Sequence, residues 1–426
     1  MNTEALHTLF LKSSGICTDT RKINDNCLFF ALRGENFNGN TFTEEALEKG
    51  ALHVVIDDIR YHKNTGETIF CKDALKQLQK LATFHRNYLK IPIIALTGSN
   101  GKTTSKELIH AVLKTSFNVS ATKGNLNNHI GVPLSLLSMN NHTEIGIIEM
   151  GANHLKEIAA LSEIAQPDYG YITNFGKAHI EGFGSVEGVI KGKTELYAYL
   201  NNHNKTAFVN ANDPKQLNLS KPLQRYTFGD NTQDCHVKLI DASEKVCLQY
   251  KDETIESNLV GIYNFHNIAA AIAIGAYFKV SAKNIKTAIE GYIPTNNRSQ
   301  LIEQKDHKIL LDAYNANPTS MLAALETFKQ SKGEPKVMIL GDMFELGATA
   351  SEEHQNITNY IEQHNIGTAF LIGENFSITK KKSDTILQFK SFSELKKYLT
   401  NNPLTGSYIL IKGSRGMALE RSLELL

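Results

Sequence analysis

A glycine-rich segment near residue 100 carries the groups that bind phosphate. An apolar run ends in the turn Gly98-Ser-Asn-Gly101, which leads into Lys102-Thr-Thr104. Such a turn surrounds one point with backbone N–H groups, a helix N-terminus and an ammonium group, and that point favours an anion. Lys102 would reach the outer phosphates of a nucleoside triphosphate, and the Thr103 hydroxyl would bind Mg2+. A plain strand-to-helix turn is the alternative, because the longer P-loop pattern wants glycine where this chain has Leu96. The predicted nucleotide contacts are Gly98, Ser99, Asn100, Gly101, Lys102, Thr103 and Thr104.

Three further residues could complete a metal–phosphate site. Glu149 ends an apolar run over residues 145–149, where a carboxylate often anchors the Mg2+ of a nucleotide. A solvated strand-end carboxylate is the alternative. His179 lies in a glycine-punctuated loop, and its imidazole would suit a second metal with mixed ligands, although a lone histidine is more often structural. Lys193, from its chemistry alone, is a lysine on a helix surface.

The composition describes an ordinary globular protein with more than one domain. A chain of 426 residues exceeds one typical domain. The hydrophobic share of 41% and the net charge of +1 give no reason to expect nucleic-acid or membrane binding. No window approaches the roughly 18–20 apolar residues of a membrane span, and the first residues lack signal-peptide features. Five cysteines without a Cys-x-x-Cys pair favour reduced thiols, so we expect a cytoplasmic protein.

The elements that must position these residues fall into three regions, and we expect an α/β fold. Residues 1–90 mix short strands with a helix over 74–89, which indicates a small α+β domain. Residues 91–293 alternate strand and helix, which predicts a parallel sheet with helices on both faces, although residues 205–260 favour antiparallel strands. Residues 294–426 are again α/β. Ligands of such sheets gather at the carboxyl ends of the strands.

Eight motifs, in order along the chain, together resemble the Mur ligases. They are TGSNGKTT, IIEMGAN, ITNFGKAHIEGFGS, KGKTELY, GIYNFHNIAAA, DAYNANP, LGDMFELG and KGSRGM. The resemblance covers nearly the whole chain. It implies a cytoplasmic, ATP-dependent enzyme that extends the peptide of the peptidoglycan precursor. The last three motifs are most similar to those of the member that adds D-alanyl-D-alanine to UDP-N-acetylmuramoyl-tripeptide.

The same resemblance implies an organisation and a set of roles. Residues 1–90 would bind the UDP-muramyl substrate, 91–293 ATP, and 294–426, a Rossmann-like domain, the dipeptide while closing on ATP. Catalysis would use Lys102, His179 and Lys193, the last carbamylated and supporting, with His179, a second Mg2+. The implied nucleotide contacts are Asn264, Asn267, Arg298 and Asp312, and the implied UDP contacts are Thr18, Asp19, Thr20 and Arg21.

Two departures from the family pattern bear on these roles. Tyr263 stands where the family more often has histidine. Asn38-Gly-Asn40 stands where members often read Asp-Gly-His, which concerns the contacts to the UDP part.

The incoming amine must be presented by the third region, since the first two are committed to the other substrates. A zwitterionic dipeptide needs a cation for its carboxylate, for which Arg415 offers a fork and Lys412 a point charge. Asp342 or Glu345 would steer the ammonium group or simply cap the following turn. The predicted dipeptide contacts are Asn315, Asn317, Lys412 and Arg415.

These observations predict an ATP-dependent carboxylate–amine ligase that works through an acyl phosphate with two Mg2+ ions. Positioning and charge neutralisation carry such chemistry. A Mur-type or polyglutamate-type ligase adding a single amino acid is the alternative. A GTPase-like switch would need an Asn-Lys-x-Asp element and a nucleotide kinase an arginine-rich lid, and the sequence has neither. We expect a monomer acting on small molecules, without nucleic-acid binding or membrane insertion.

Overall fold

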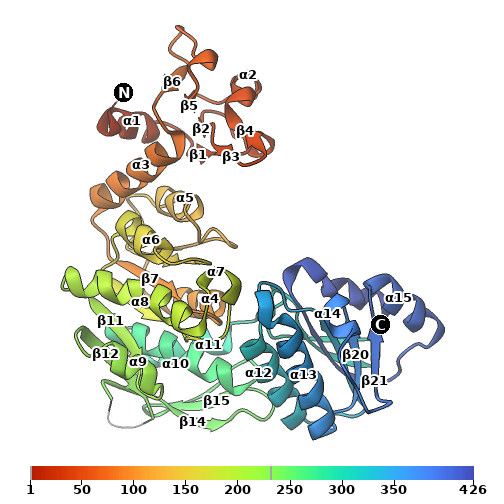
Figure 1. Ribbon diagram of the computed structural model, residues 1–426. Helices are drawn as coiled ribbons and strands as arrows, with labels where there is room; N and C mark the ends of the chain where they lie inside the picture. Colours follow the sequence, from red (N-terminus) through yellow and green to blue (C-terminus); the bar gives the residue numbers. More distant parts are fainter. Residues whose placement is uncertain (1, 231–232) are drawn as a thin grey trace.

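The structure, a computed structural model, describes residues 2–230 and 233–426. Each of the three regions is built around its own sheet (Figure 1). The N-terminal region (residues up to 90) lies above the central region (91–293), and the C-terminal region (294–426) lies beside the central one. In the described ranges no helix combines the length and the apolar character that crossing a membrane requires.

The N-terminal region holds a four-stranded parallel sheet in the order β1-β2-β5-β6. A short antiparallel pair, β3–β4, forms a separate two-stranded sheet in this region. The strands are β1 (Ile16–Cys17), β2 (Leu28–Phe30), β3 (Arg33–Gly34), β4 (Phe37–Asn38), β5 (His53–Ile56) and β6 (Thr68–Phe70). The helices are α1 (Thr3–Phe10), α2 (Thr43–Glu48) and α3 (Ala74–Leu89), with 3-10 turns η1 (Thr20–Lys22), η2 (Gly39–Phe42) and η3 (Ile59–Tyr61).

The central region holds a seven-stranded parallel sheet in the order β13-β12-β11-β10-β7-β9-β8. The strands are β7 (Ile93–Thr97), β8 (Val119–Ala121), β9 (Ile145–Glu149), β10 (Tyr169–Ile172), β11 (Thr206–Asn210), β12 (Gln224–Gly229) and β13 (Cys235–His236). The chain runs from β7 to one edge and then crosses to β10 on the other side of β7. Such a switch point leaves a crevice at the carboxyl end of β7.

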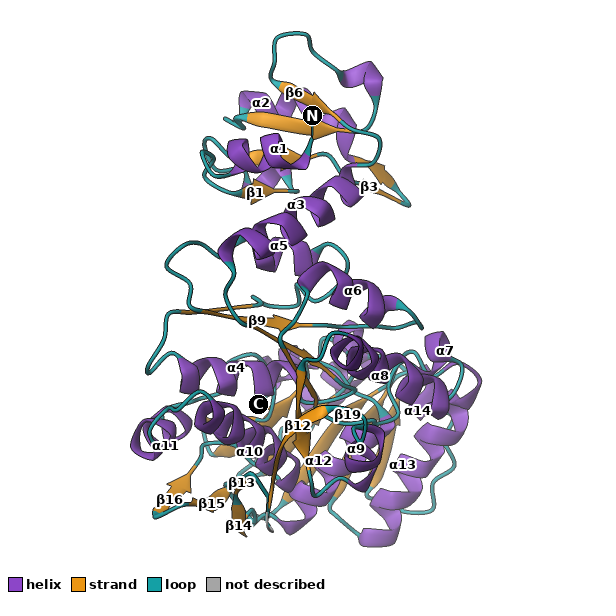
Figure 2. Cartoon of the chain, turned by 90° about the vertical axis from the view of Figure 1, so that its left-hand side faces the viewer, coloured by secondary structure: helices purple, strands orange, loops and turns teal. Residues whose placement is uncertain are grey.

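Helices cover both faces of this sheet (Figure 2). One face is packed by α5 (Gly131–Leu137), α6 (Glu157–Ala165) and α8 (Val186–Asn202), and the other by α4 (Lys102–Leu113), α10 (Ile262–Tyr277) and α11 (Ala282–Glu290). Two short helices, α7 (Ile180–Phe183) and α9 (Pro214–Leu219), follow strands. The antiparallel expectation for residues 205–260 holds for β14 (Lys238–Asp241), β15 (Cys247–Tyr250) and β16 (Glu253–Glu256). It was wrong for β11 and β12, which extend the parallel sheet because burial beside β10 decides their pairing.

The C-terminal region holds a six-stranded sheet in the order β17-β18-β22-β19-β20-β21, with only β17 pairing antiparallel among its described strands. The strands are β17 (Gln300–Gln304), β18 (His307–Asp312), β19 (Lys336–Gly341), β20 (Thr368–Ile372), β21 (Ile386–Phe389) and β22 (Tyr408–Lys412). The helical elements are α12 (Pro318–Gln330), α13 (Ala350–His364), α14 (Glu374–Ser377), α15 (Phe392–Asn401), η4 (Gly347–Thr349), η5 (Arg415–Met417) and η6 (Leu419–Leu425). The carboxyl ends of β18 and β22 face the central region and supply residues to the site below.

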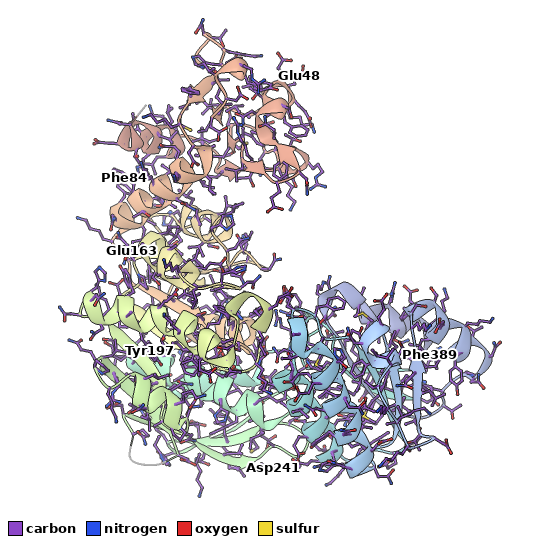
Figure 3. All side chains as sticks on the ribbon, viewed as in Figure 1. Glu48, Phe84, Glu163, Tyr197, Asp241 and Phe389 are labelled. Carbon is purple, nitrogen blue, oxygen red and sulfur yellow. The ribbon has the colours of Figure 1, made fainter. Side chains whose placement is uncertain are left out.

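Helix α3 joins the N-terminal and central regions. The Asp73 side chain caps its first turn by accepting a hydrogen bond from the Lys76 N–H at 2.9 Å, and Lys90 ends it in the left-handed conformation before Pro92. One side of α3 borders a surface hollow that it shares with α6, where Figure 3 labels Phe84 of α3 and Glu163 of α6. Its buried side belongs to an apolar core that continues from Leu6 and Phe30 into the central sheet.

Candidate active site

The turn after β7 has the backbone conformation of a phosphate loop. Gly98 and Gly101 have φ values of +142° and +78°, which side-chain-bearing residues rarely adopt. A Cβ atom on Gly98 would lie 2.0 Å from Thr173 Oγ1, and one on Gly101 would lie 2.5 Å from Asn267 Oδ1. Both glycines are therefore required by conformation and by space. The loop then opens α4, whose first-turn N–H groups point toward the site.

The end of strand β10 braces this loop. The Ser99 and Asn100 N–H groups donate to the backbone and side-chain oxygens of Asn174, each at 3.1 Å. The Thr173 hydroxyl donates to Asn100 O at 2.6 Å. These bonds fix the loop before any ligand arrives.

Lys102 folds back over the loop. Its Nζ donates to Gly98 O at 2.7 Å, and burial lowers the pKa of this ammonium group. An incoming phosphate would supply the negative charge that the buried lysine lacks.

Glu149 and Thr103 lie together at the carboxyl ends of β7 and β9. Glu149 is buried, and its Oε1 accepts hydrogen bonds from Asn127 Nδ2 at 2.9 Å and Thr103 Oγ1 at 3.3 Å. Its Oε2 has no hydrogen-bond partner among the described residues, and Lys106 Nζ lies 3.8 Å away. A buried carboxylate oxygen without a partner, beside a hydroxyl, fits an Mg2+ ligand set. No group of three His, Cys, Asp or Glu side chains suited to a metal occurs within the part of the chain that the structure describes.

A ladder of asparagines links α10 to the phosphate loop. Asn264 Nδ2 donates to Val260 O at 2.8 Å, Asn267 Nδ2 to Asn264 Oδ1 at 2.9 Å, and Ser105 Oγ to Asn267 Oδ1 at 3.0 Å. Tyr263, the departure from the family pattern, is held instead by a hydrogen bond between its hydroxyl and Ser299 Oγ at 2.8 Å.

The C-terminal region closes over this site through polar contacts. Asn317 caps α12 and its Nδ2 also donates to Asn100 Oδ1 in the phosphate loop at 2.7 Å. The Arg298 guanidinium stacks on the Tyr314 ring, 3.6 Å from its centre, and its Nε is buried without a hydrogen-bond partner among the described residues. An unpaired guanidinium N–H in a phosphate-binding cavity favours a bound anion.

Asp312 and Lys412 form a buried ion pair, with 2.6 Å between Oδ2 and Nζ. Lys412 also donates to Asn315 O at 3.3 Å and is only 1% exposed. Its ammonium group is thus already neutralised, so the structure gives it a partner other than the dipeptide carboxylate that we expected.

Lys193 is fully buried, so its interpretation as a surface lysine was wrong. Its Nζ donates to Ala152 O at 3.2 Å and lies 5.2 Å from the centre of the Phe183 ring. Burial holds the pKa of this amine well below its usual range, with a smaller contribution from the charge of Lys102. The spacing Val189, Lys193, Leu196, Leu200 places Lys193 on the apolar face of α8, and this was the signal available in the sequence.

His179 reaches across to the C-terminal region. Its Nδ1 contacts Glu345 Oε2, and this contact holds the pKa of the Glu345 carboxyl below its usual value. Asp342, the other acid considered for the ammonium group, accepts hydrogen bonds from the Asn375 and Phe376 N–H groups at 2.9 and 3.0 Å and so caps α14.

One cavity of about 630 Å3 brings most of the predicted residues together. Those lining it are Ser99, Asn100, Gly101, Lys102, Thr103, Thr104, Glu149, His179, Asn264, Asn267, Arg298, Asp312, Asn315, Asn317 and Lys412. Those outside its lining are Gly98, Lys193, Thr18, Asp19, Thr20, Arg21 and Arg415.

The outlying residues keep local partners. Asp19 caps η1 and pairs with the exposed Arg21 at 2.8 Å, which holds the pKa of Asp19 well below its usual range. Arg415 pairs with Glu420 at 2.9 Å and lies 5.8 Å from the centre of the Tyr314 ring, at the cavity edge. Asn40 is buried, donates to the Asp57 carboxylate at 2.8 Å and thereby ties the β3–β4 pair to β5.

Sequence reasoning missed several residues of the site. Asn127, Asn174 and Tyr314 all line or brace the cavity, and each stands in a segment rich in asparagine or within a recognised motif. No sequence pattern near either residue predicts the contact between Glu345 and His179.

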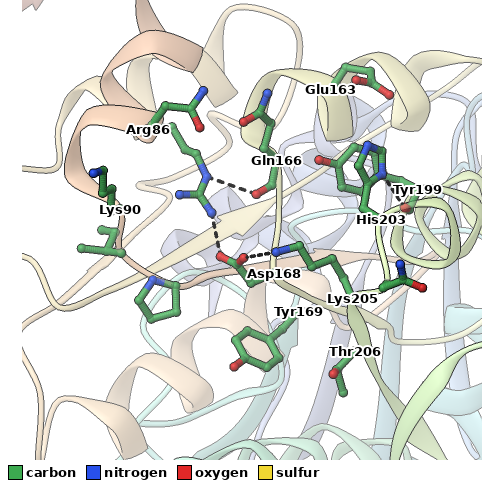
Figure 4. A pocket seen from close by; sticks show the side chains of 14 residues that line it. Arg86, Lys90, Glu163, Gln166, Asp168, Tyr169, Tyr199, His203, Lys205 and Thr206 are labelled. Carbon is green, nitrogen blue, oxygen red and sulfur yellow. Dashed lines mark hydrogen bonds and ion pairs between the residues drawn. The ribbon is translucent and has the colours of Figure 1, made fainter.

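A second cavity, of about 780 Å3, lies at the amino ends of strands β7, β10 and β11 of the central sheet (Figure 4). Asp168 stands at its centre and pairs with Arg86 at 2.6 Å and with Lys205 at 2.7 Å. Although this cavity is larger, its central carboxylate is already paired with two cations, and it lies at the amino ends of the strands, away from the phosphate loop. The smaller cavity therefore has the stronger chemical argument.

Comparisons with known proteins agree with this geometry. The models described as "Mur ligase family, catalytic domain", "Mur ligase middle domain" and "Mur ligase, glutamate ligase domain" match residues 12–85, 96–275 and 297–415. The UDP-N-acetylmuramoyl-tripeptide–D-alanyl-D-alanine ligase of Bacillus subtilis (strain 168) is 35% identical, over 95% of this chain and 91% of the relative. MurF from Acinetobacter baumannii has a TM-score of 0.86 at 28% identity, covering 96% of this chain and 92% of that one. MurF from Thermotoga maritima, in complex with ADP, has a TM-score of 0.85 at 26% identity, covering 97% of both chains.

Proposed function

The chain belongs to the Mur ligase family, and we propose that it joins D-alanyl-D-alanine to UDP-N-acetylmuramoyl-tripeptide, converting ATP to ADP and phosphate. The observation that carries the proposal is the single cavity in which the phosphate loop and Glu149 meet Arg298 and Asn317 of the C-terminal region. Relatives similar over nearly the whole chain carry the name of this activity.

The residues of the cavity have roles in this reaction. The substrate carboxylate attacks the γ-phosphorus of ATP, ADP leaves, and the amine then displaces phosphate from the acyl phosphate. Lys102 and the N–H groups of α4 bind the phosphates, and Arg298 neutralises charge from the opposite side. Thr103 and Glu149 would hold Mg2+, which supplies further charge neutralisation when bound. Closure of the C-terminal region excludes water from the reactive intermediate.

The three regions divide the substrates. Residues 1–90, with Thr18, Asp19, Thr20 and Arg21, bind the UDP end; residues 91–293 bind ATP; and residues 294–426 present the dipeptide. Arg415 at the cavity edge serves the dipeptide carboxylate, because Lys412 is occupied by Asp312. The monomeric state and the cytoplasmic location stay predictions.

Lys193 is proposed to be carbamylated. An unprotonated amine adds to CO2 and releases a proton, which leaves a carboxylate on nitrogen, and burial, which lowers the pKa of Lys193, favours the required neutral form. With His179 this carboxylate would hold a second Mg2+. Lys193→Ala should lose activity and regain part of it with small carboxylic acids, whereas Lys193→Arg should gain nothing from them. Full activity in Lys193→Ala would refute the carbamate.

The test of the whole proposal is phosphate release with UDP-N-acetylmuramoyl-tripeptide and four amines supplied separately. D-alanyl-D-alanine should support turnover, and D-alanine, D-glutamate and meso-diaminopimelate should not. If a single amino acid supports turnover better than the dipeptide, the alternative of a single-residue-adding ligase takes its place.

A further inference from the structure

The segment that connects the central and C-terminal regions is tied to the phosphate-binding helix. It runs from the end of α11 to the start of β17, over residues 291–299. Glu107, one turn after Thr103 on α4, accepts hydrogen bonds from the Tyr292 hydroxyl at 2.6 Å and from Asn296 Nδ2 at 2.8 Å. The two bonds use different carboxylate oxygens, so Glu107 holds the segment at Tyr292 and at Asn296 together.

From Asn297 onward the segment is bonded to the C-terminal region instead. Asn297 O accepts from the Tyr314 N–H, and the Ser299 N–H donates to Asp312 Oδ1, each at 3.1 Å. The Tyr263–Ser299 hydroxyl contact is a cross-link back to α10. The side chains of Tyr292 and Asn296 are thus bonded to the central region, and the backbone groups of Asn297 and Ser299 to the C-terminal region, which places a pivot between Asn296 and Asn297.

Arg298 lies directly beyond this pivot. Its neighbours Asn297 and Ser299 both have left-handed φ values, +56° and +50°, which fixes the direction in which Arg298 leaves the backbone. Its stacking on Tyr314 makes it move with the C-terminal region. Rotation at the pivot thus sets the distance between Arg298 and the phosphate loop.

We propose that Glu107 is a positioning residue for ATP use: it holds the central end of the pivot on the phosphate-binding helix and so sets where Arg298 meets the phosphates. This inference rests on the proposed function. Glu107 touches no substrate and acts through Arg298. It lies on the same helix as Lys102 and Thr103, so the two sides of the phosphate site share one rigid support.

The experiment compares Glu107→Ala with Glu107→Gln in steady-state kinetics. Glu107→Ala removes two hydrogen bonds to a charged acceptor and should raise the KM for ATP about tenfold. The KM for UDP-N-acetylmuramoyl-tripeptide should stay within about twofold, because that substrate does not depend on the pivot. Glu107→Gln should behave nearly as wild type, since its amide oxygen accepts from Asn296 and its amide nitrogen donates to the Tyr292 oxygen. Glu144→Ala, which removes a carboxylate that accepts from the Asn118 N–H at the far edge of the central sheet, is the matched control and should change neither KM.

Calorimetric binding of ADP separates this inference from the proposed function, because it needs no turnover. Glu107→Ala and Arg298→Ala should each weaken ADP binding, and the double variant should be no weaker than the worse single variant. Additive losses, or a fall in thermal stability with both KM values unchanged, would overturn the role of Glu107. Absence of turnover with every amine, together with the expected ADP result, would refute only the proposed function.

Discussion

The two junctions of this molecule are built from different interactions. At the first, between the N-terminal and central regions, one apolar core continues across the boundary through α3. At the second, between the central and C-terminal regions, Val260 alone among the described central residues joins a C-terminal apolar cluster. Polar contacts predominate there, and they include Asn100 with Asn317, Lys177 with Glu353, and His179 with Glu345.

Polar contacts at the first junction support the apolar ones. Gln79, Thr83 and Arg86 on α3 donate at 3.0–3.1 Å to backbone carbonyls of the central region, and His85 Nε2 lies 3.0 Å from the carbonyl of Met139. Buried apolar area is costly to expose, whereas hydrogen bonds between polar side chains can be exchanged for hydrogen bonds to water at a smaller cost. The comparison therefore predicts that the N-terminal and central regions move as one body and that the C-terminal region is the one that closes.

The largest effect should come from the cavity at the second junction, and it should lower the reaction rate rather than the stability of the fold. Lys102→Ala removes the cation that we propose meets the transferring phosphoryl group, so kcat should fall by about 100- to 1000-fold. Phosphate release measures this loss of activity. The urea midpoint should not decrease, since burying a charged group costs free energy and the substitution removes that group. Lys114→Ala, an exposed lysine just beyond the end of the same helix, is the control and should keep full activity. Near-normal turnover in Lys102→Ala would mean that the phosphate loop is misassigned.

The next effect should come from the first junction and should show the opposite pattern. Arg86→Ala breaks the bonds to Gln166 and Asp168, and the free energy of unfolding should fall by about 2 kcal/mol. We place it below the loss for a fully buried pair because Asp168 is partly exposed and keeps Lys205. Urea unfolding measures it, with kcat expected to stay close to wild type.

A matched arginine tests whether position or residue type decides the result. Arg60→Ala removes an exposed arginine that pairs with Asp58 inside the N-terminal region, so it should lower the urea midpoint much less than Arg86→Ala does. If Arg86→Ala lowered turnover without lowering stability, the first junction would be a working hinge and the comparison would fail.

The geometry of the candidate phosphate site was predictable because its signals are local. Gly98 and Gly101 set the turn, and the run before Glu149 announces a buried strand whose end must face the ligand edge. Contacts between regions had no such signal. Asn100 meets Asn317 and Lys412 meets Asp312 only after whole domains have packed, and neither residue type nor spacing encodes that. For the same reason β11 was assigned to an antiparallel group although it pairs with β10.

The third effect is the pH dependence of stability that we expect from a histidine pair near the first junction. His7 Nε2 and His85 Nδ1 lie 3.0 Å apart in the core under α1 and α3, and burial lowers the pKa of both, with mutual repulsion adding for His7. The unfolded chain then binds more protons than the folded one below the ordinary histidine pKa of 6.5, so stability is full above that pH and is lost as pH falls below it.

The loss should be about 1 kcal/mol between pH 7.5 and 5.5, measured as urea midpoints. Other partly buried histidines whose pKa is lowered, such as His110 and His266, contribute to the same slope. The pH dependence of the urea midpoint is therefore compared between two proteins. His7→Phe should show a shallower dependence on pH than the wild type. Equal slopes would show that this pair stays out of the pH response of the junction.

The smallest effect should come from the exposed edge of the second junction. Lys177 Nζ pairs with Glu353 Oε1 at 2.7 Å, and Lys177 is half exposed. Lys177→Ala should shift the closed-to-open equilibrium by about 0.5 kcal/mol, roughly twofold, and the shift should shrink at high salt, where screening weakens the pair. Small-angle scattering with ADP and UDP-N-acetylmuramoyl-tripeptide at low and high ionic strength would record it as reduced compaction. Arg86→Ala, which removes the ion pair with Asp168 across the first junction instead, should leave the ligand-induced compaction unchanged. If both variants altered compaction equally, both junctions would share the motion, because only an interface that opens can respond to the loss of an ion pair across it.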